Sequence, residues 1–221
     1  PLYPMPRSCR LLLPLVLPLF LACGGAKPVA EKPRDHEGAE ATHGGAGKNQ
    51  RALIMRLFME ANQARLKGEL PKAIQLFEAT LKEDPQNAAS MFELAKLYNQ
   101  AQAPQEALAL AKRAVTTDKD NIWYRFLLAD MSLQNSDLAG AAKAYQDIIA
   151  KWPDRYEVYF GLAGTLAEQK KVTEARQVYR DLEKRIGSNQ ELVMREYDML
   201  ANAGQTEAAR DLLTDAIAKH P

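Results

Sequence analysis

The chain has 221 residues, of which 47% are hydrophobic, and a formal net charge of +1 at pH 7. This composition allows a sizeable core, and the balanced charge argues against nucleic acid as a partner. The two cysteines are Cys9 and Cys23, and the three histidines are His36, His43 and His220. The long region between His43 and His220 therefore offers no thiol or imidazole. We expect no enzymatic activity, cofactor, metal or small-molecule substrate.

Residues 1–22 have the pattern of a secretory signal peptide. Arg7 and Arg10 precede an apolar run, Leu11 to Ala22. The run is too short to cross a bilayer, which needs about 20 apolar residues, and it has the length of a signal-peptide core. The chain as given begins with proline. Met5 is the expected start, because it places both arginines in a compact basic segment.

The apolar run ends in Leu19-Phe20-Leu21-Ala22-Cys23-Gly24, which resembles the lipobox of bacterial lipoproteins. The resemblance implies a lipid attached to Cys23, although Phe20 stands where that motif usually has leucine. No aspartate follows Cys23, and in enterobacterial lipoproteins this favours the outer membrane, facing the periplasm. Two alternatives stay open. The run could be a short apolar anchor, or cleavage after Ala22 or Gly24 could release a soluble periplasmic protein.

Residues 23–50 are rich in Gly, Ala, Lys, Glu and Pro and have no apolar period. Such a segment buries too little apolar surface to offset the entropy lost on ordering. The composition predicts a disordered linker that follows the lipidated N-terminus. A flexible coil of about 27 residues has an r.m.s. reach of roughly 30 Å.

Residues 51–221 repeat with a step of 34 residues. Alanine recurs in two registers of that step, the first being Ala61, Ala95, Ala129 and Ala163, with Tyr197 in fifth place, and the second Ala73, Ala107, Ala141, Ala175 and Ala209. Turn-forming residues lie between the two registers, and helix-stopping clusters such as Asp84-Pro85 follow the second. The pattern predicts five units of helix A, turn, helix B and turn, at about 54–87, 88–121, 122–155, 156–189 and 190–221.

These units resemble tetratricopeptide repeats. The second unit carries the resemblance best, with Leu94-Ala95 and Tyr98 in helix A and Ala107 and Ala114 in helix B. The resemblance implies an all-α fold, a right-handed superhelical solenoid of antiparallel helix pairs stabilised by contacts between neighbours. The small positions lie where helices A and B cross, so a bulky side chain there would overpack the crossing by about 1–3 kcal/mol.

The resemblance also implies where partners bind. Helices A line the concave face of such a solenoid, where family members hold extended or helical peptides, so we expect a scaffold for protein or peptide partners. Phenylalanine occupies the fifth position of helix A in four units, which predicts an apolar ladder. The ladder either only packs between helices or also contacts a ligand. The candidate groove residues are Phe58, Phe92, Lys96, Asn99, Trp123, Phe126, Asp130 and Phe160.

Three functional hypotheses follow. The leading one is a membrane-tethered scaffold or adaptor of the bacterial cell envelope. The second is a recruitment or substrate-delivery region of a larger envelope protein whose catalytic or peptidoglycan-binding part follows Pro221. It is motivated by Leu212, Leu213 and Ile217 in the last unit, which would be exposed without a polar cap. The third is a soluble periplasmic chaperone-like holder.

Overall fold

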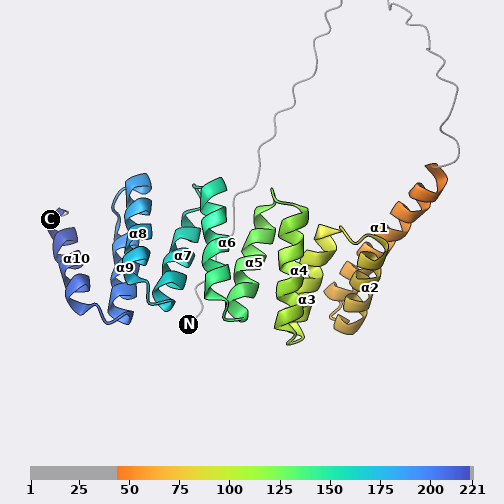
Figure 1. Cartoon of the computed structure of the whole chain (residues 1–221), viewed down its shortest axis with the longest axis horizontal. Helices are drawn as coiled ribbons and strands as arrows, with labels where there is room; N and C mark the ends of the chain where they lie inside the picture. The colour runs from red at the N-terminus through yellow and green to blue at the C-terminus, as the bar shows by residue number, and fades with distance from the viewer. Residues whose placement is uncertain (1–43, 220–221) are drawn as a thin grey trace, which may run out of the picture. The chain divides into compact units, whose positions relative to one another are not determined.

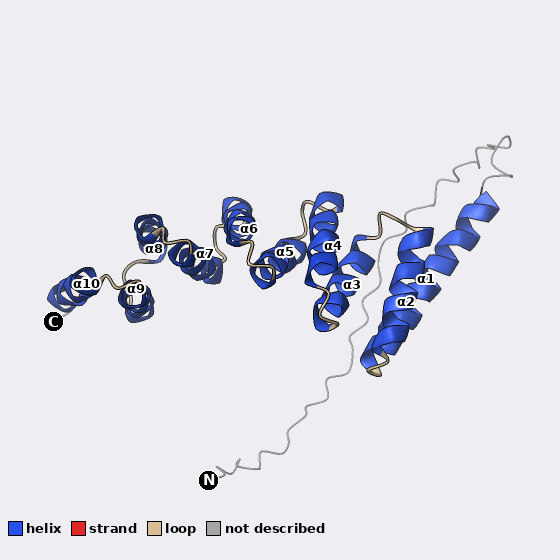
Figure 2. Ribbon diagram, turned by 60° about the horizontal axis from the view of Figure 1, so that its bottom comes forward, coloured by secondary structure: helices blue, strands red, loops and turns tan. Residues whose placement is uncertain are grey.

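The computed structural model describes residues 44–219, which form ten α-helices and no strand. Successive helices lie side by side and run antiparallel, so they pair into hairpins that follow one another (Figures 1 and 2). The predicted all-α solenoid of helix pairs is confirmed. The helices are α1 (Gly44–Leu66), α2 (Leu70–Glu83), α3 (Ala88–Gln100), α4 (Pro104–Thr117), α5 (Ile122–Gln134), α6 (Leu138–Lys151), α7 (Tyr156–Glu168), α8 (Val172–Ile186), α9 (Gln190–Asn202) and α10 (Thr206–Lys219).

The predicted signal peptide, Cys23 and most of the predicted linker lie outside the described residues. Of the helices between residues 44 and 219, none combines the length and the apolar character needed to cross a lipid bilayer.

Polar residues in the turns begin several helices. The side chain of Asn87 accepts a hydrogen bond from the backbone N–H of Ser90 at 3.0 Å, and Asp137 does the same for Gly140 at 2.8 Å. Each bond satisfies an N–H group that has no partner within its own helix. Pro104 is the first residue of α4, where its missing N–H costs nothing.

Each turn between helices A and B contains one residue with positive φ. These residues are also 34 positions apart, and their φ values lie between 57° and 76°: Gly68, Gln102, Ser136, Lys170 and Gly204. A residue in the left-handed conformation ends an α-helix, because it turns the chain so that the next N–H groups donate to the last free carbonyl oxygens of the helix. Only the first and last units have glycine there, so the three middle turns hold a non-glycine residue in a disfavoured conformation.

The two alanine registers form the centre of the core. Their side chains have almost no contact with solvent, because the helices of a hairpin cross at these positions; they are Ala61, Ala95, Ala129, Ala163, Ala73, Ala107, Ala141, Ala175 and Ala209. Tyr197, in the fifth place of the first register, is half-buried and packs against the core. A bulky residue is accommodated there because α9 and α10 pack less closely than the first three hairpins.

The first helix begins earlier than the first predicted unit. α1 starts at Gly44, so residues 44–50, which the composition placed in the linker, are helical. The side-chain amide of Gln50 donates a hydrogen bond to the backbone oxygen of Glu83 at 3.3 Å. This bond joins the first half of α1 to the end of α2, a contact between residues 33 positions apart that local composition does not reveal.

Candidate functional site

The phenylalanine ladder, formed by Phe58, Phe92, Phe126 and Phe160, contacts the core and also forms part of the surface of helices A, called here the wall. All four residues are half-buried. The ring of Phe58 packs edge-on against Phe77 of α2, with centroids 5.7 Å apart, and Phe160 packs against Tyr179 of α8 at 6.1 Å. In these two units, the fifth position of helix A therefore packs against helix B of its own hairpin. A structural role is shown for these phenylalanines, and only part of each ring faces solvent.

The middle of the ladder also connects neighbouring units. The ring of Phe92 in α3 lies 5.5 Å from that of Tyr124 in α5, which joins the second unit to the third. Within α5, the ring of Phe126 lies 5.9 Å from that of Trp123. Trp123 is 60% exposed, a large fraction for an aromatic side chain that already has a packing partner. It is the most accessible aromatic residue of the predicted groove set.

Two cations lie over the ladder. The Lys96 ammonium is 5.0 Å from the centroid of Phe92 in the same helix, and the Arg195 guanidinium is 4.4 Å from that of Phe160 in the preceding unit. Cation–π contacts of this kind stabilise by about 0.5–1 kcal/mol at exposed sites. They place positive charge beside apolar surface at two points of the wall.

A small ion-pair network links the first two units. Glu93 of α3 pairs with Arg65 of α1 at 3.4 Å and with Lys96 at 3.2 Å. Glu93 was not among the predicted groove residues. Its carboxylate positions Lys96, which was predicted, while Asn99 one turn further along α3 is half-buried.

Asp130 occupies an exposed position of α5. Its side chain reaches solvent, yet burial by the surrounding protein raises the pKa of its carboxyl group. Tyr145 is a neighbouring group, because its own pKa responds to the charge of Asp130. Tyr145 of α6, whose pKa is raised by burial and by the charge of Asp130, packs against Gly161 of α7 so closely that a methyl group there would lie 3.0 Å from its ring. A larger residue at position 161 would require this ring to shift.

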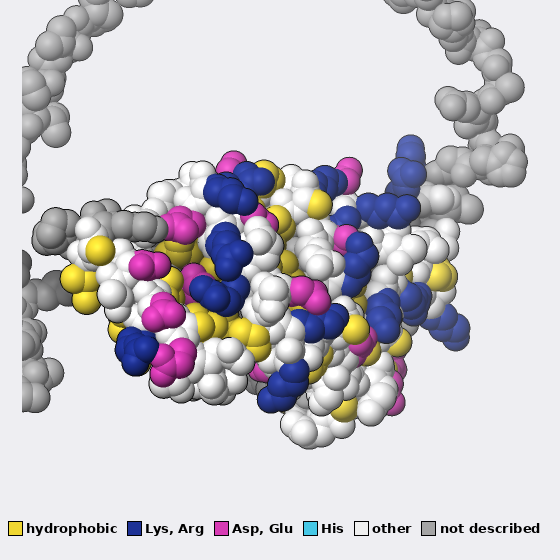
Figure 3. Space-filling model, turned by 60° about the vertical axis from the view of Figure 1, so that its left-hand side comes forward, with side chains coloured by type: hydrophobic (Ala, Val, Ile, Leu, Met, Phe, Trp, Pro, Cys, Tyr) yellow, Lys and Arg dark blue, Asp and Glu magenta, His cyan; other side chains and the backbone are white. Residues whose placement is uncertain are grey.

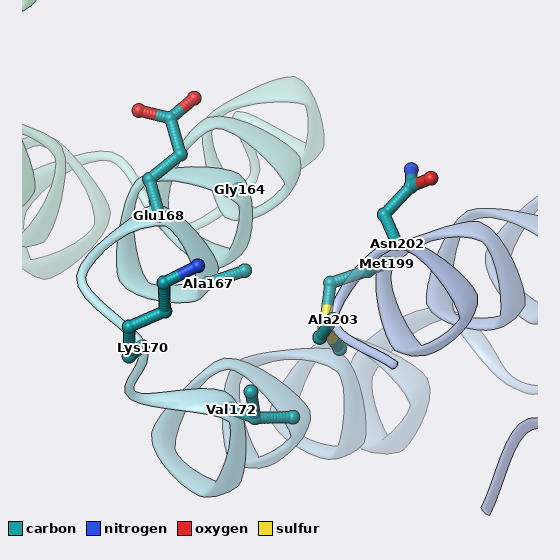
Figure 4. A pocket seen from close by; sticks show the side chains of 8 residues that line it. All are labelled: Gly164, Ala167, Glu168, Lys170, Val172, Met199, Asn202 and Ala203. Atoms are coloured by element: carbon teal, nitrogen blue, oxygen red, sulfur yellow. The ribbon is translucent and has the colours of Figure 1, made fainter. Parts of the chain in front are cut away.

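A hollow lies further along the chain, between α7 and α9 (Figure 4). Its volume is about 470 Å³. A Cβ atom added at Gly164 would meet no other atom within 4 Å. Figure 4 shows Glu168 and Asn202 pointing outward at the rim. The residues that line this hollow, called here the α7–α9 hollow, are Gly164, Ala167, Glu168, Lys170, Val172, Met199, Asn202 and Ala203.

The α7–α9 hollow was not among the predicted sites. Asn62, Lys96 and Asp130 occupy the register of Gly164 in the first three units, so the fourth unit has no side chain where the others have a polar one. Ala167 is also small and extends the gap by one turn. The signal for it in the sequence is a glycine at position 164, followed by an alanine at position 167, in a register that is polar in the first three units.

Two exposed carboxylates have partners that make them unsuited to general acid catalysis. Asp120 is exposed and pairs with Lys151, and Asp181 accepts a hydrogen bond from Lys184 at 2.9 Å. These partners lower the pKa of both carboxyl groups, whereas a general acid needs a raised pKa. Between residues 44 and 219, no three His, Cys, Asp or Glu side chains are grouped to hold a metal ion. Figure 3 shows acidic and basic side chains interspersed on the face in view.

Antiparallel hairpins with small residues at each crossing and a mixed apolar and polar wall define an α-solenoid that acts as a protein–protein interaction scaffold. The family model described as tetratricopeptide repeat matches residues 58–122 and 126–190, more than half of the chain. The chain therefore belongs to the tetratricopeptide repeat family, whose members are typically non-catalytic.

Several solved structures share this fold. The chain is similar to MamA, with 19% identity and a TM-score of 0.62 over 76% of this chain and 91% of that one. It is also similar to YrrB, with 17% identity and a TM-score of 0.60 over 80% and 91% of the two chains. A tetratricopeptide repeat protein from Parabacteroides merdae has 16% identity and a TM-score of 0.63 over 77% and 68%. No curated protein matches the sequence.

Proposed function

We propose that this protein is a lipid-anchored scaffold of the bacterial cell envelope, attached through Cys23 to the outer membrane and facing the periplasm. Its partners are proteins that offer an extended or helical peptide segment to the wall formed by helices A. The tetratricopeptide repeat family supports the binding role. The support for the location is the sequence that ends at Cys23, with its basic start, its short apolar run and its lipobox-like residues.

The observation that carries the binding role is the chemistry of this wall. It combines half-exposed phenylalanine rings, the 60% exposed Trp123 and the α7–α9 hollow with the amide of Asn202 at its rim. Apolar anchors supply most of the affinity for a bound segment, and an amide side chain can donate to and accept from a peptide backbone. One structural neighbour, YrrB, is a tetratricopeptide protein with an unusual peptide-binding site, which is in keeping with a peptide ligand.

The wall is tested by affinity capture from the native envelope. We expect Phe92→Ala combined with Phe126→Ala to weaken capture of the co-purifying partner while the helical circular dichroism signal is retained. The matched control is Leu108→Ala with Ile149→Ala, which truncates two half-buried apolar side chains on helices B. Equal capture by all three proteins would contradict binding at this wall.

The anchor is tested separately by metabolic labelling with palmitate. The wild type and Cys9→Ser should be labelled, and Cys23→Ser should not, because only Cys23 follows the lipobox-like residues. A mass spectrum of the mature N-terminus identifies the modified residue. Label that persists in Cys23→Ser would exclude this anchor.

A further inference from the structure

The outward side of α1 carries an apolar stripe. Met55, Met59 and Leu66 are 66%, 65% and 77% exposed, and their spacing of four and seven residues places them on one side of the helix. Ala52 extends the stripe by a turn. A shallow hollow of about 570 Å³ lies along it, lined by Ala52, Met55, Arg56, Met59, Glu60 and Gln63.

Basic side chains flank this stripe. Lys48, Arg51 and Arg56 are exposed on α1, and Lys67 follows its last residue. From Gly47 to Leu66 the helix has one acidic residue, Glu60, which lies 3.9 Å from Arg56. We call the apolar stripe and these four cations the α1 outer face. It combines large apolar side chains with a net positive charge.

Packing fixes the direction in which the α1 outer face points. Gln50 is hydrogen-bonded to the end of α2, and Lys48 and Arg51 lie on the helix surface away from it. In later units, the position of Met59 is occupied by residues that contact the preceding unit. Glu93 pairs with Arg65, and Arg195 lies over Phe160. Within residues 44–219 no unit precedes that of Met59, and its side chain is exposed. Figure 2 shows the first turns of α1 extending past the end of α2.

We propose that the α1 outer face docks onto an anionic phospholipid surface. The proposal rests on the proposed lipid anchor. Cys23 precedes Gly44 by 21 residues, and a flexible coil of that length has an r.m.s. reach of roughly 25 Å. Helices with basic residues beside large exposed apolar side chains are found in the plane of lipid interfaces, with the apolar side chains below the head groups. The α1 outer face presents both kinds of side chain. Lys48, Arg51, Arg56 and Lys67 attract anionic head groups.

Charge favours a lipid surface over a second copy of this chain. Two α1 outer faces packed against each other would bring together four cations and one acidic residue from each copy. The junctions between units inside the solenoid, in contrast, are built mainly from Ala, Leu and aromatic side chains. The α1 outer face lies on helix A of the first unit, so docking there leaves the helices A of units two to five free to bind a partner.

The test uses the full chain with Cys9 and Cys23 replaced by serine and one cysteine introduced for a fluorescent label. Met59→Cys reports on the α1 outer face, and Lys112→Cys, at an exposed site on α4, is the control. Phosphatidylcholine vesicles with and without phosphatidylglycerol carry a nitroxide lipid that quenches a label at the interface. We expect quenching at position 59 only with phosphatidylglycerol, none at position 112, and loss of quenching when Lys48, Arg51 and Arg56 are changed to Glu.

Equal quenching at positions 59 and 112, or quenching unaffected by the charge reversal, would overturn the proposal. A label at position 59 that responds to protein concentration without vesicles would assign the face to a second copy instead. Neither result bears on palmitate labelling or on partner capture, so failure here is distinguishable from failure of the proposed function.

Discussion

The guanidinium of Arg195 lies 4.4 Å from the ring centroid of Phe160, and the two residues belong to consecutive units. Tyr179 contacts both: its ring packs against Phe160, and its hydroxyl donates to the backbone oxygen of Arg195 at 3.2 Å. Burial raises the pKa of Tyr179 to about 12, even further above neutral pH than its ordinary value of 10.0, and the protonated hydroxyl is the donor. The junction between the fourth and fifth units is thus closed by one residue from each of α7, α8 and α9.

Arg195→Ala should lower the free energy of unfolding by about 1 kcal/mol, because it removes the cation–π contact and exposes the ring of Phe160. Arg195→Lys should retain part of the effect. Urea denaturation followed by circular dichroism measures both changes. Arg180→Ala, at an exposed position of α8, is the control and should change stability by less than about 0.5 kcal/mol. A loss in Arg180→Ala as large as that in Arg195→Ala would contradict the role of this contact.

Ala163→Tyr should destabilise the protein by at least about 1–3 kcal/mol, because Ala163 lies at a fully buried helix crossing with no room for a ring. Tyr197 occupies the same register in the fifth unit and is half-buried, so the natural tyrosine is tolerated only there. Thermal unfolding compares Ala163→Tyr with Gln134→Tyr, which adds the same side chain at an exposed position of α5. Similar melting temperatures for the two variants would show that this crossing accommodates large residues.

Asp130→Asn should stabilise the protein at neutral pH. Burial raises the folded-state pKa of Asp130 above its ordinary value of 3.8. The folded state therefore binds more protons than the unfolded state between these two values, and stability falls as the pH rises through that window. The asparagine variant does not incur this loss. Its advantage in urea denaturation should disappear below about pH 3.8, where the carboxyl group is protonated in both states. A difference that is the same at both pH values would rule out this cause.

Gly164→Leu should fill the α7–α9 hollow and weaken partner capture at least severalfold, because the leucine side chain would occupy space available to a ligand. A Cβ atom at Gly164 meets no other atom within 4 Å, and the hollow lies beside it, so the fold should be retained. Gly47→Leu makes the same change at a helical glycine of α1 that is equally open, and it should leave capture unchanged. Unaltered capture by Gly164→Leu would remove the hollow from the binding site.

The helices, the hairpins and the small residues at their crossings could be predicted from the sequence. The 34-residue period repeats the same packing constraint four times in the first alanine register and five times in the second, so it can be recognised in the sequence. The beginning of α1 could not be predicted, because Gln50 finds its partner on α2, at Glu83. The tolerance for Tyr197 also depends on how closely α9 and α10 pack, which is a property of two helices together.

For the candidate site too, one part could be predicted from the sequence and another part depends on the tertiary structure. The sequence by itself determined that phenylalanine recurs at one register of helix A, because register follows from counting along the chain. Only the tertiary structure decided that these rings are half-buried, that Arg195 covers Phe160 and that Glu93 holds Lys96. Each of these contacts joins separate helices or depends on side-chain conformation. The α7–α9 hollow is the clearest case. The small residues Gly164 and Ala167 of α7 leave space that only the position of α9, with Met199 and Asn202, turns into a hollow.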